Sequence, residues 1–198
     1  RQGRTERRNC RKRMARTWTG HRLPAYDAGM ITVWGRTNSV NVQKVLWALA
    51  ELGLDFRRVD AGMQFGVVGT DAYRALNPNA LVPTLDDDGL VLWESNAIVR
   101  YLAARYGAGT LAPADPGERA LADRWMDWQA TALYPAMMPA FLGLVRKAPQ
   151  VGPEAVEASR AKTEAWLAIL DAHLAGRDFV GGSAFTMGDI PVGATCWR

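Results

Sequence analysis

The stretch LVPTLDDDGLVLWESNA, residues 81–97, determines which fold this chain can adopt. Residues 82–85 and 90–93 are short, mainly apolar runs on either side of an acidic turn that contains one glycine, which predicts a β-hairpin. Glu94 and Ser95 follow the second run at once and open a segment with apolar residues at helical spacing. The stretch therefore predicts two antiparallel strands that lead directly into a helix.

Upstream of the hairpin, the chain predicts a strand–helix–strand unit and one further short helix. Ser39 opens a segment whose apolar positions recur every three or four residues until Gly53 ends it. The expected elements are strands at residues 31–35 and 55–60, helices at residues 39–52 and 72–76, and a helix at residues 95–106 after the hairpin. The predicted order is β-α-β-α-β-β-α.

The second half of the chain is predicted to be helical. Residues 110–117 contain two prolines and little apolar content, which favours a linker. Apolar residues at helical spacing predict helices over residues 118–146 and 154–175. Pro135 and Pro139 are expected to kink or divide the first of these.

Near the end of the chain, Thr186 and Asp189 form a T-x-x-D pattern before an apolar residue. The threonine is expected to cap the start of a helix, and the aspartate is expected to reach back to it, as in a capping box. We assign this pair a role in folding rather than in chemistry.

The net charge of +4 is misleading, because the basic residues are concentrated at the start of the chain. Residues 1–29 hold nine Lys or Arg and two acidic residues, so the remainder is net acidic. Such an arm can bind nucleic acid or act as a targeting peptide. The favoured interpretation is a disordered basic extension or upstream translated sequence, without an assigned function. No nucleic-acid partner is expected for the rest of the chain.

The cysteines and the apolar content argue against a disulfide- or metal-stabilised protein and against a membrane-spanning one. Cys10 and Cys196 lie near opposite ends and form no metal-binding or CxxC spacing, which is typical of a reducing compartment. No apolar run approaches the roughly 20 residues that cross a bilayer. The sequence therefore predicts a soluble, cytoplasmic protein with no metal and no membrane partner.

Three features together resemble the glutathione S-transferase family. They are the V-P step and E-S-N-A helix start of residues 81–97, the segment WGRTNSVNVQKV at residues 34–45, and the T-x-x-D pattern in a helical second half. The segment at residues 34–45 is similar to the serine-type, theta-like bacterial members of the family.

The resemblance implies an α/β plus all-α fold with two domains. A thioredoxin-like glutathione-binding domain is expected over residues 30–111, and an all-helical domain over residues 116–198. Further helices follow the T-x-x-D helix in the family, so the chain is expected to be truncated at its C-terminus. The full-length protein is expected to be a homodimer.

The resemblance also implies how glutathione binds. A cis peptide bond between Val82 and Pro83 would present a backbone edge to the cysteinyl amide of the tripeptide. Ser95 and the free N–H groups of its helix start suit the γ-glutamyl carboxylate, and Glu94 suits the ammonium group. The structural alternative is that Ser95 is only an N-cap and Glu94 only a favourable charge near the helix start.

The reactive group would be the glutathione sulfur, as a thiolate. A free thiol has a pKa of about 8.5, so a hydroxyl donor at a helix N-terminus would favour its ionisation. The resemblance to serine-type members makes Ser39 the predicted donor, although Ser39 could instead only cap its helix. Arg36, Asn38 and Asn41 are second candidates that could donate to the sulfur or hold the electrophile.

In the family, one helix forms a wall of the pocket that binds the electrophile. That helix carries Tyr134, Met137, Met138 and Phe141, a soft surface that suits a hydrophobic co-substrate but also suits a core. Arg146 is a candidate anion anchor. The predicted function is transfer of an alkyl or aryl group from a small electrophile to glutathione, in detoxification. A glutathione-dependent isomerase or peroxidase and a non-catalytic glutathione-binding scaffold stay open as alternatives.

Overall fold

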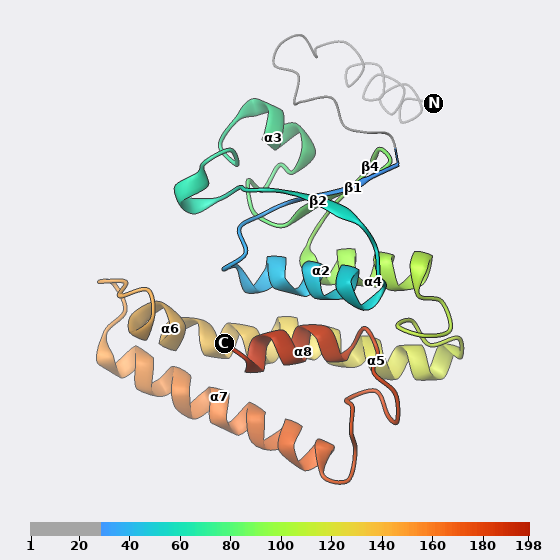
Figure 1. Ribbon diagram of the computed structural model, residues 1–198. Coiled ribbons are helices and arrows are strands. Elements are labelled where there is room, and N and C mark those ends of the chain that lie inside the picture. Colours follow the sequence, from blue (N-terminus) through green and yellow to red (C-terminus); the bar gives the residue numbers. More distant parts are fainter. Residues whose placement is uncertain (1–28) are drawn as a thin grey trace, which may run out of the picture.

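The computed structural model describes residues 29–198, so the extension predicted for residues 1–29 lies outside the described residues except for Gly29. The described chain is built in layers (Figure 1). A four-stranded sheet is covered on one face by α2 (Val40–Glu51) and α4 (Ser95–Tyr106), and the other long helices lie beyond these two. An α/β part followed by a helical part confirms the predicted fold class.

The sheet has the strand order β2-β1-β3-β4. Strand β1 (Ile31–Trp34) pairs in parallel with β2 (Phe56–Val59) and antiparallel with β3 (Thr84–Asp87). Strand β3 forms the predicted hairpin with β4 (Leu90–Trp93). It begins two residues later than predicted, because Pro83 has no N–H to donate to the ladder.

Alternating side chains of the central strands point to opposite faces of the sheet. Val33 and Leu85 are fully buried in the larger core cluster, which α2 and α4 share. Trp34 belongs to a smaller cluster with Tyr73 of α3 (Asp71–Leu76) on the other face. Both faces of the sheet are therefore covered, and the larger core lies between the sheet and the helices.

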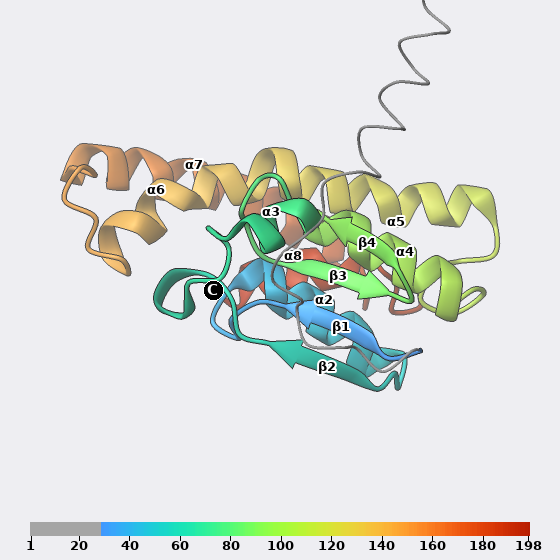
Figure 2. The same cartoon turned by 90° about the horizontal axis from the view of Figure 1, so that it is seen from above.

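The helical part contains α5 (Pro116–Trp128), α6 (Tyr134–Leu144), α7 (Pro153–Leu174) and α8 (Asp189–Cys196). Between α5 and α6 lies η2 (Gln129–Leu133), a π-helical turn. Figure 2 shows α5 and α6 following one another along one long path across the molecule. No helix in the described part of the chain is long and apolar enough to cross a membrane.

The expected irregularity of the first long helix lies beside Pro135 and not at Pro139. It is η2, which ends two residues before Pro135. The backbone stays helical through Leu133 and Tyr134, so the helix changes its hydrogen-bonding pattern there without a break. Pro139 stays inside α6. The hydroxyl of Ser159 on α7 accepts a hydrogen bond from the N–H of Ala140 and donates one to the C=O of Ala136, at 3.0 and 2.5 Å. A side chain of α7 thus satisfies the backbone of α6 next to this proline.

The segment predicted as a linker is packed rather than free. Leu111 is 5 % exposed, and its C=O accepts a hydrogen bond from the N–H of Met187 at 2.8 Å. The larger core cluster includes residues of both parts of the chain. The division into domains at residues 30–111 and 116–198 stays a prediction, and the two parts share one apolar core.

The T-x-x-D pattern lies at the start of α8, and Asp189 reaches back to Thr186 as predicted, whereas the residue that immediately precedes the helix is Gly188 rather than Thr186. Oδ2 of Asp189 accepts hydrogen bonds from the N–H and the hydroxyl of Thr186, at 2.9 and 3.1 Å. Oδ1 accepts one from the N–H of Val180 at 2.8 Å, and the Thr186 hydroxyl accepts one from the N–H of Gly188 at 3.3 Å. Thr186 and Asp189 are both buried, so the pair satisfies backbone groups that water cannot reach.

Asp189→Ala should lower the free energy of unfolding by on the order of 3 kcal/mol, because two backbone N–H groups lose a charged acceptor in a buried site. Chemical denaturation followed by circular dichroism measures the change. Asp178→Ala removes an exposed carboxylate from the preceding loop and is the matched control, with an expected change within about 0.5 kcal/mol. Equal effects of the two substitutions would contradict the capping role.

Candidate active site

Ser39 lies immediately before α2 and lines a cavity of about 420 Å³. Its backbone is extended, with φ −93° and ψ 122°, and its side chain makes no hydrogen bond to the helix. Ser39 is 7 % exposed. Its hydroxyl therefore lies at a helix N-terminus beside the cavity without serving as a cap.

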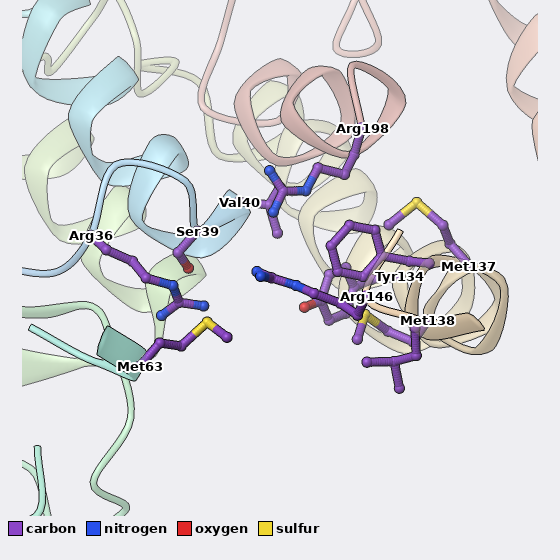
Figure 3. A pocket seen from close by; sticks show the side chains of 11 residues that line it. Arg36, Ser39, Val40, Met63, Tyr134, Met137, Met138, Arg146 and Arg198 are labelled. Atoms are coloured by element: carbon purple, nitrogen blue, oxygen red, sulfur yellow. The ribbon is translucent and has the colours of Figure 1, made fainter. Parts of the chain in front are cut away.

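The structure brings one of the three second candidates to the same cavity. Arg36 lines it together with Ser39 (Figure 3). Asn38 instead lines a second cavity of about 360 Å³. Asn41 lies beside Tyr134: burial raises the pKa of this tyrosine, and the charges of Arg198 and Arg36 and the side chain of Asn41 oppose the rise. Of the four predicted catalytic candidates, Ser39 and Arg36 are thus the two that line the same cavity.

The peptide bond between Val82 and Pro83 is cis. The hydroxyl of Tyr73 donates to the C=O of Leu81 at 2.6 Å and lies 2.8 Å from the hydroxyl of Thr84. Within the described residues, the backbone of Val82 makes no hydrogen bond. Buried side chains therefore hold both flanks of this turn and leave the backbone edge of Val82 unused.

Gly62 brings this edge next to the cavity. A Cβ atom at Gly62 would lie 3.1 Å from Nη1 of Arg36 and 3.4 Å from Cγ1 of Val82, so the two side chains are neighbours across this glycine. Gly62 has a φ of +85° and precedes a 3-10 turn, Met63–Phe65. The first residue of that turn lines the cavity.

Glu94 and Ser95 lie at the start of α4. Glu94 has φ 71° and ψ 108°, a conformation that costs a non-glycine residue on the order of 1 kcal/mol and concentrates at ligand-binding sites. Ser95 is the first residue of the helix and is buried. Its hydroxyl accepts a hydrogen bond from the side chain of Lys44 at 3.4 Å. Ser95 is therefore positioned from α2 and is not the N-cap of α4.

Lys44, a buried lysine of α2, was not predicted from the sequence. Its ammonium Nζ lies 3.4 Å from Oγ of Ser95, 3.1 Å from Oδ1 of Asn96 and 3.2 Å from Oε1 of Gln129. Lys44 is 3 % exposed. Burial lowers the pKa of Lys44 to about 8, and the negative charge of Glu94 opposes this shift. Its place among the apolar positions of α2 is the sequence feature that could have revealed it.

Gln129 extends these contacts into the helical part. Its side chain is fully buried, and Nε2 donates to Oγ1 of Thr195 at 2.8 Å. The Thr195 hydroxyl donates in turn to the C=O of Pro191 at 2.8 Å. Asn96 donates through Nδ2 to the C=O of Met126 at 2.9 Å. This buried network ties the start of α4 to α5, η2 and α8.

Comparison with known proteins identifies the family. Residues 29–104 match the family model of the glutathione S-transferase N-terminal domain. Glutathione S-transferase GstB of Escherichia coli (strain K12) is 47% identical over 166 residues, which cover 82% of this chain and 80% of that protein. The chain belongs to the glutathione S-transferase family.

Solved structures of this family agree with the assignment. The theta class glutathione S-transferase of Xanthomonas axonopodis pv. citri, with glutathione bound, is 48% identical with a TM-score of 0.79, over 83% of this chain and 80% of that one. The Bombyx mori glutathione transferase BmGSTD1 is 28% identical with a TM-score of 0.77, over 84% of this chain and 76% of that one. The family that the sequence motifs indicated is thus confirmed.

In this glutathione S-transferase family chain, the wall of the cavity opposite Ser39 comes from α6. All four predicted wall residues line it: Tyr134, Met137, Met138 and Phe141. Arg146 lines it as well, and so does Arg198, which the sequence did not indicate. Among the described residues, no group of three or more His, Cys, Asp or Glu side chains could hold a metal ion.

The buried ammonium of Lys44 should make stability depend on pH. The unfolded chain keeps its proton up to a pKa near 10.5, whereas the folded chain loses it near 8, so between these values the unfolded state binds more protons. The free energy of unfolding of the wild type, relative to Lys44→Met, should therefore rise with pH, by up to about 1.4 kcal/mol per unit.

Urea denaturation of both proteins at several values between pH 8 and 10 measures this slope. Lys162→Met removes an exposed lysine of α7 and serves as the matched control. A difference between wild type and Lys44→Met that stays constant over this range would show that the Lys44 ammonium is not desolvated.

Proposed function

We propose that this chain activates the thiol of glutathione for attack on a small electrophile. The observation that carries the proposal is the hydroxyl of Ser39, which lies beside the cavity at the start of α2 without capping the helix. A serine that served only as an N-cap would accept a hydrogen bond from an N–H group of the first helical turn. Family membership supports glutathione as the co-substrate.

We infer that glutathione lies along the Val82 edge, with its γ-glutamyl end at the start of α4. Lys44 has three donors and no acceptor, so it occupies a lone pair of the Ser95 oxygen and leaves the O–H hydrogen for a ligand. A carboxylate can accept that hydrogen and the free N–H groups of the helix start. Glu94 supplies the negative charge for the ammonium group beside it.

The thiol would then lie near Ser39. A hydrogen bond from the Ser39 hydroxyl favours the charged sulfur over the neutral thiol, and the positive end of α2 acts in the same direction. The guanidinium of Arg36 adds a positive charge to the same cavity. Each of these effects lowers the pKa of the bound thiol from its free value of about 8.5.

The proposed reaction is a displacement at carbon. The thiolate forms a carbon–sulfur bond while the leaving group departs with the electron pair of its own bond to that carbon, and the thiol proton has already gone to solvent. The methionine and aromatic side chains of α6 supply an adaptable wall for the apolar part of the electrophile. A homodimer, a cytoplasmic location and a role in detoxification stay predictions.

Ser39→Ala should raise the pKa of bound glutathione towards the free value, because the sulfur loses its hydrogen-bond donor. Titration of the ultraviolet absorbance of the thiolate in the wild type and the variant measures this pKa. The turnover number with 1-chloro-2,4-dinitrobenzene should fall by on the order of 100-fold. Ser39→Thr keeps a hydroxyl at the same place and is the matched control, with a smaller change in both quantities.

The same titration separates the alternatives. Glutathione that binds to the wild type without any change in its pKa would support a non-catalytic binding protein. A lowered pKa with turnover of a hydroperoxide, but not of the halide, would support the peroxidase alternative. No binding of glutathione would contradict the proposal altogether.

A further inference from the structure

Three arginine side chains line the cavity beside Ser39. Arg36 comes from the loop between β1 and α2, Arg146 follows α6, and Arg198 follows α8. Figure 3 shows Arg36 on the Ser39 side, Arg198 above, and the long side chain of Arg146 extending from the α6 wall towards Ser39. Three segments that are far apart in the sequence thus each place a positively charged side chain at the same cavity.

Nothing in the described part of the chain neutralises these charges. No carboxylate of the described residues forms an ion pair with any of the three guanidiniums, and no acidic residue lines the cavity. Nε of Arg36 is buried and has no hydrogen-bond partner. Burial and the neighbouring guanidiniums lower the pKa of Arg36, and burial and Arg146 lower that of Arg198. Positive charges that lie together without a counterion repel one another, and water screens part of this repulsion at the exposed Arg198 and the partly exposed Arg36 and Arg146.

Neighbouring groups hold these side chains at the cavity. The guanidinium of Arg198 donates to the C=O of Asn38 at 2.7 Å and lies 4.9 Å from the ring centroid of Phe141. The guanidinium of Arg146 lies 5.5 Å from the same ring. Nη1 of Arg36 lies next to Gly62, where an added Cβ atom would come within 3.1 Å of it. Arginines stacked on an aromatic ring keep their N–H groups available for a carboxylate.

We propose that the electrophile of this protein carries an anionic group, a carboxylate in the first instance, which Arg146 binds together with Arg36 and Arg198. Its apolar body would lie on the methionine and aromatic wall of α6, with the reactive carbon towards the thiolate at Ser39. The inference rests on the proposed function and names the substrate class of that site. A neutral hydrophobic electrophile would leave the three charges uncompensated.

Glutathione is a second source of carboxylate for the same guanidiniums, through its glycyl end. The two sources differ in what a substitution changes. An arginine that binds the electrophile affects catalysis most with anionic electrophiles, whereas an arginine that binds the tripeptide weakens the binding of glutathione. Arg146 is the residue to test, since it lies on the α6 side of the cavity, away from the Val82 edge and the start of α4.

The test compares 4-(chloromethyl)benzoate with its methyl ester. In both, the glutathione sulfur forms a bond to the benzylic carbon and chloride leaves with the electron pair. Each kcat/KM is divided by the uncatalysed rate constant with glutathione, which removes the intrinsic difference between the two halides. The wild type should favour the carboxylate by on the order of 10-fold or more, as a charged hydrogen-bonded pair implies.

Arg146→Met should remove that preference, because kcat/KM falls far more for the carboxylate than for the ester, and the KM for glutathione should stay unchanged. Lys147→Met removes the adjacent exposed cation with the same change of net charge and is the matched control, with no expected effect on the preference. Arg146→Lys keeps the charge and should retain part of the preference. Thermal melting of each variant verifies that it is folded.

Three results would overturn the inference: no preference in the wild type, equal losses for both halides in Arg146→Met, or a loss confined to glutathione binding. If neither of these halides nor 1-chloro-2,4-dinitrobenzene is turned over, the proposed function fails, and calorimetry still tests the anion site. Binding of 4-methylbenzoate, which has no leaving group, should be detected for the wild type and lost in Arg146→Met. Absence of that binding would overturn the anion site as well.

Discussion

A buried lysine needs oxygen acceptors, and this requirement links the two parts of the chain. The ammonium of Lys44 is surrounded by side-chain oxygens of Ser95, Asn96 and Gln129. Two of these belong to α4 and one to the π-helical turn before α6. Removing any one of them would leave one N–H of this buried ammonium without its acceptor, which costs on the order of 1–3 kcal/mol. The relative positions of α2, α4 and η2 are therefore constrained by one charge.

The same constraint connects the two ends of the candidate site. Ser39 and Lys44 lie on one helix, so a shift of α2 would move the candidate thiolate donor together with the group that holds Ser95. The hydrogen bonds of a buried charged group resist such a shift, because water cannot replace them. Gln129 also donates a hydrogen bond to Thr195, so α8 is held in place by the same set of contacts. The helical part thus acts as a support for the glutathione side, as well as supplying the wall of the cavity.

Local chemistry predicted much of this structure from the sequence. The hairpin and the helix at Ser95 follow from the turn residues and the apolar pattern of residues 81–97, which depend on near neighbours. Pro135 predicted an irregularity of the long helix, whereas the π-helical form of η2 could not be predicted from the apolar pattern. Lys44 was missed because a lysine is ordinarily exposed, and only contacts with distant residues make its burial tolerable. The gathering of three arginines was invisible for the same reason.

The arginines and the thiolate would act on one another through the same space. A positive cavity stabilises the charged sulfur before the electrophile arrives, because opposite charges within a few ångströms interact strongly where water is scarce. A bound carboxylate would neutralise part of that field and raise the basicity of the sulfur at the moment of attack. Nucleophilicity of a thiolate increases with its basicity. With an anionic electrophile, the empty positive cavity would favour ionisation of the sulfur, and the bound carboxylate would then increase the reactivity of the thiolate. A neutral electrophile would gain only from the ionisation.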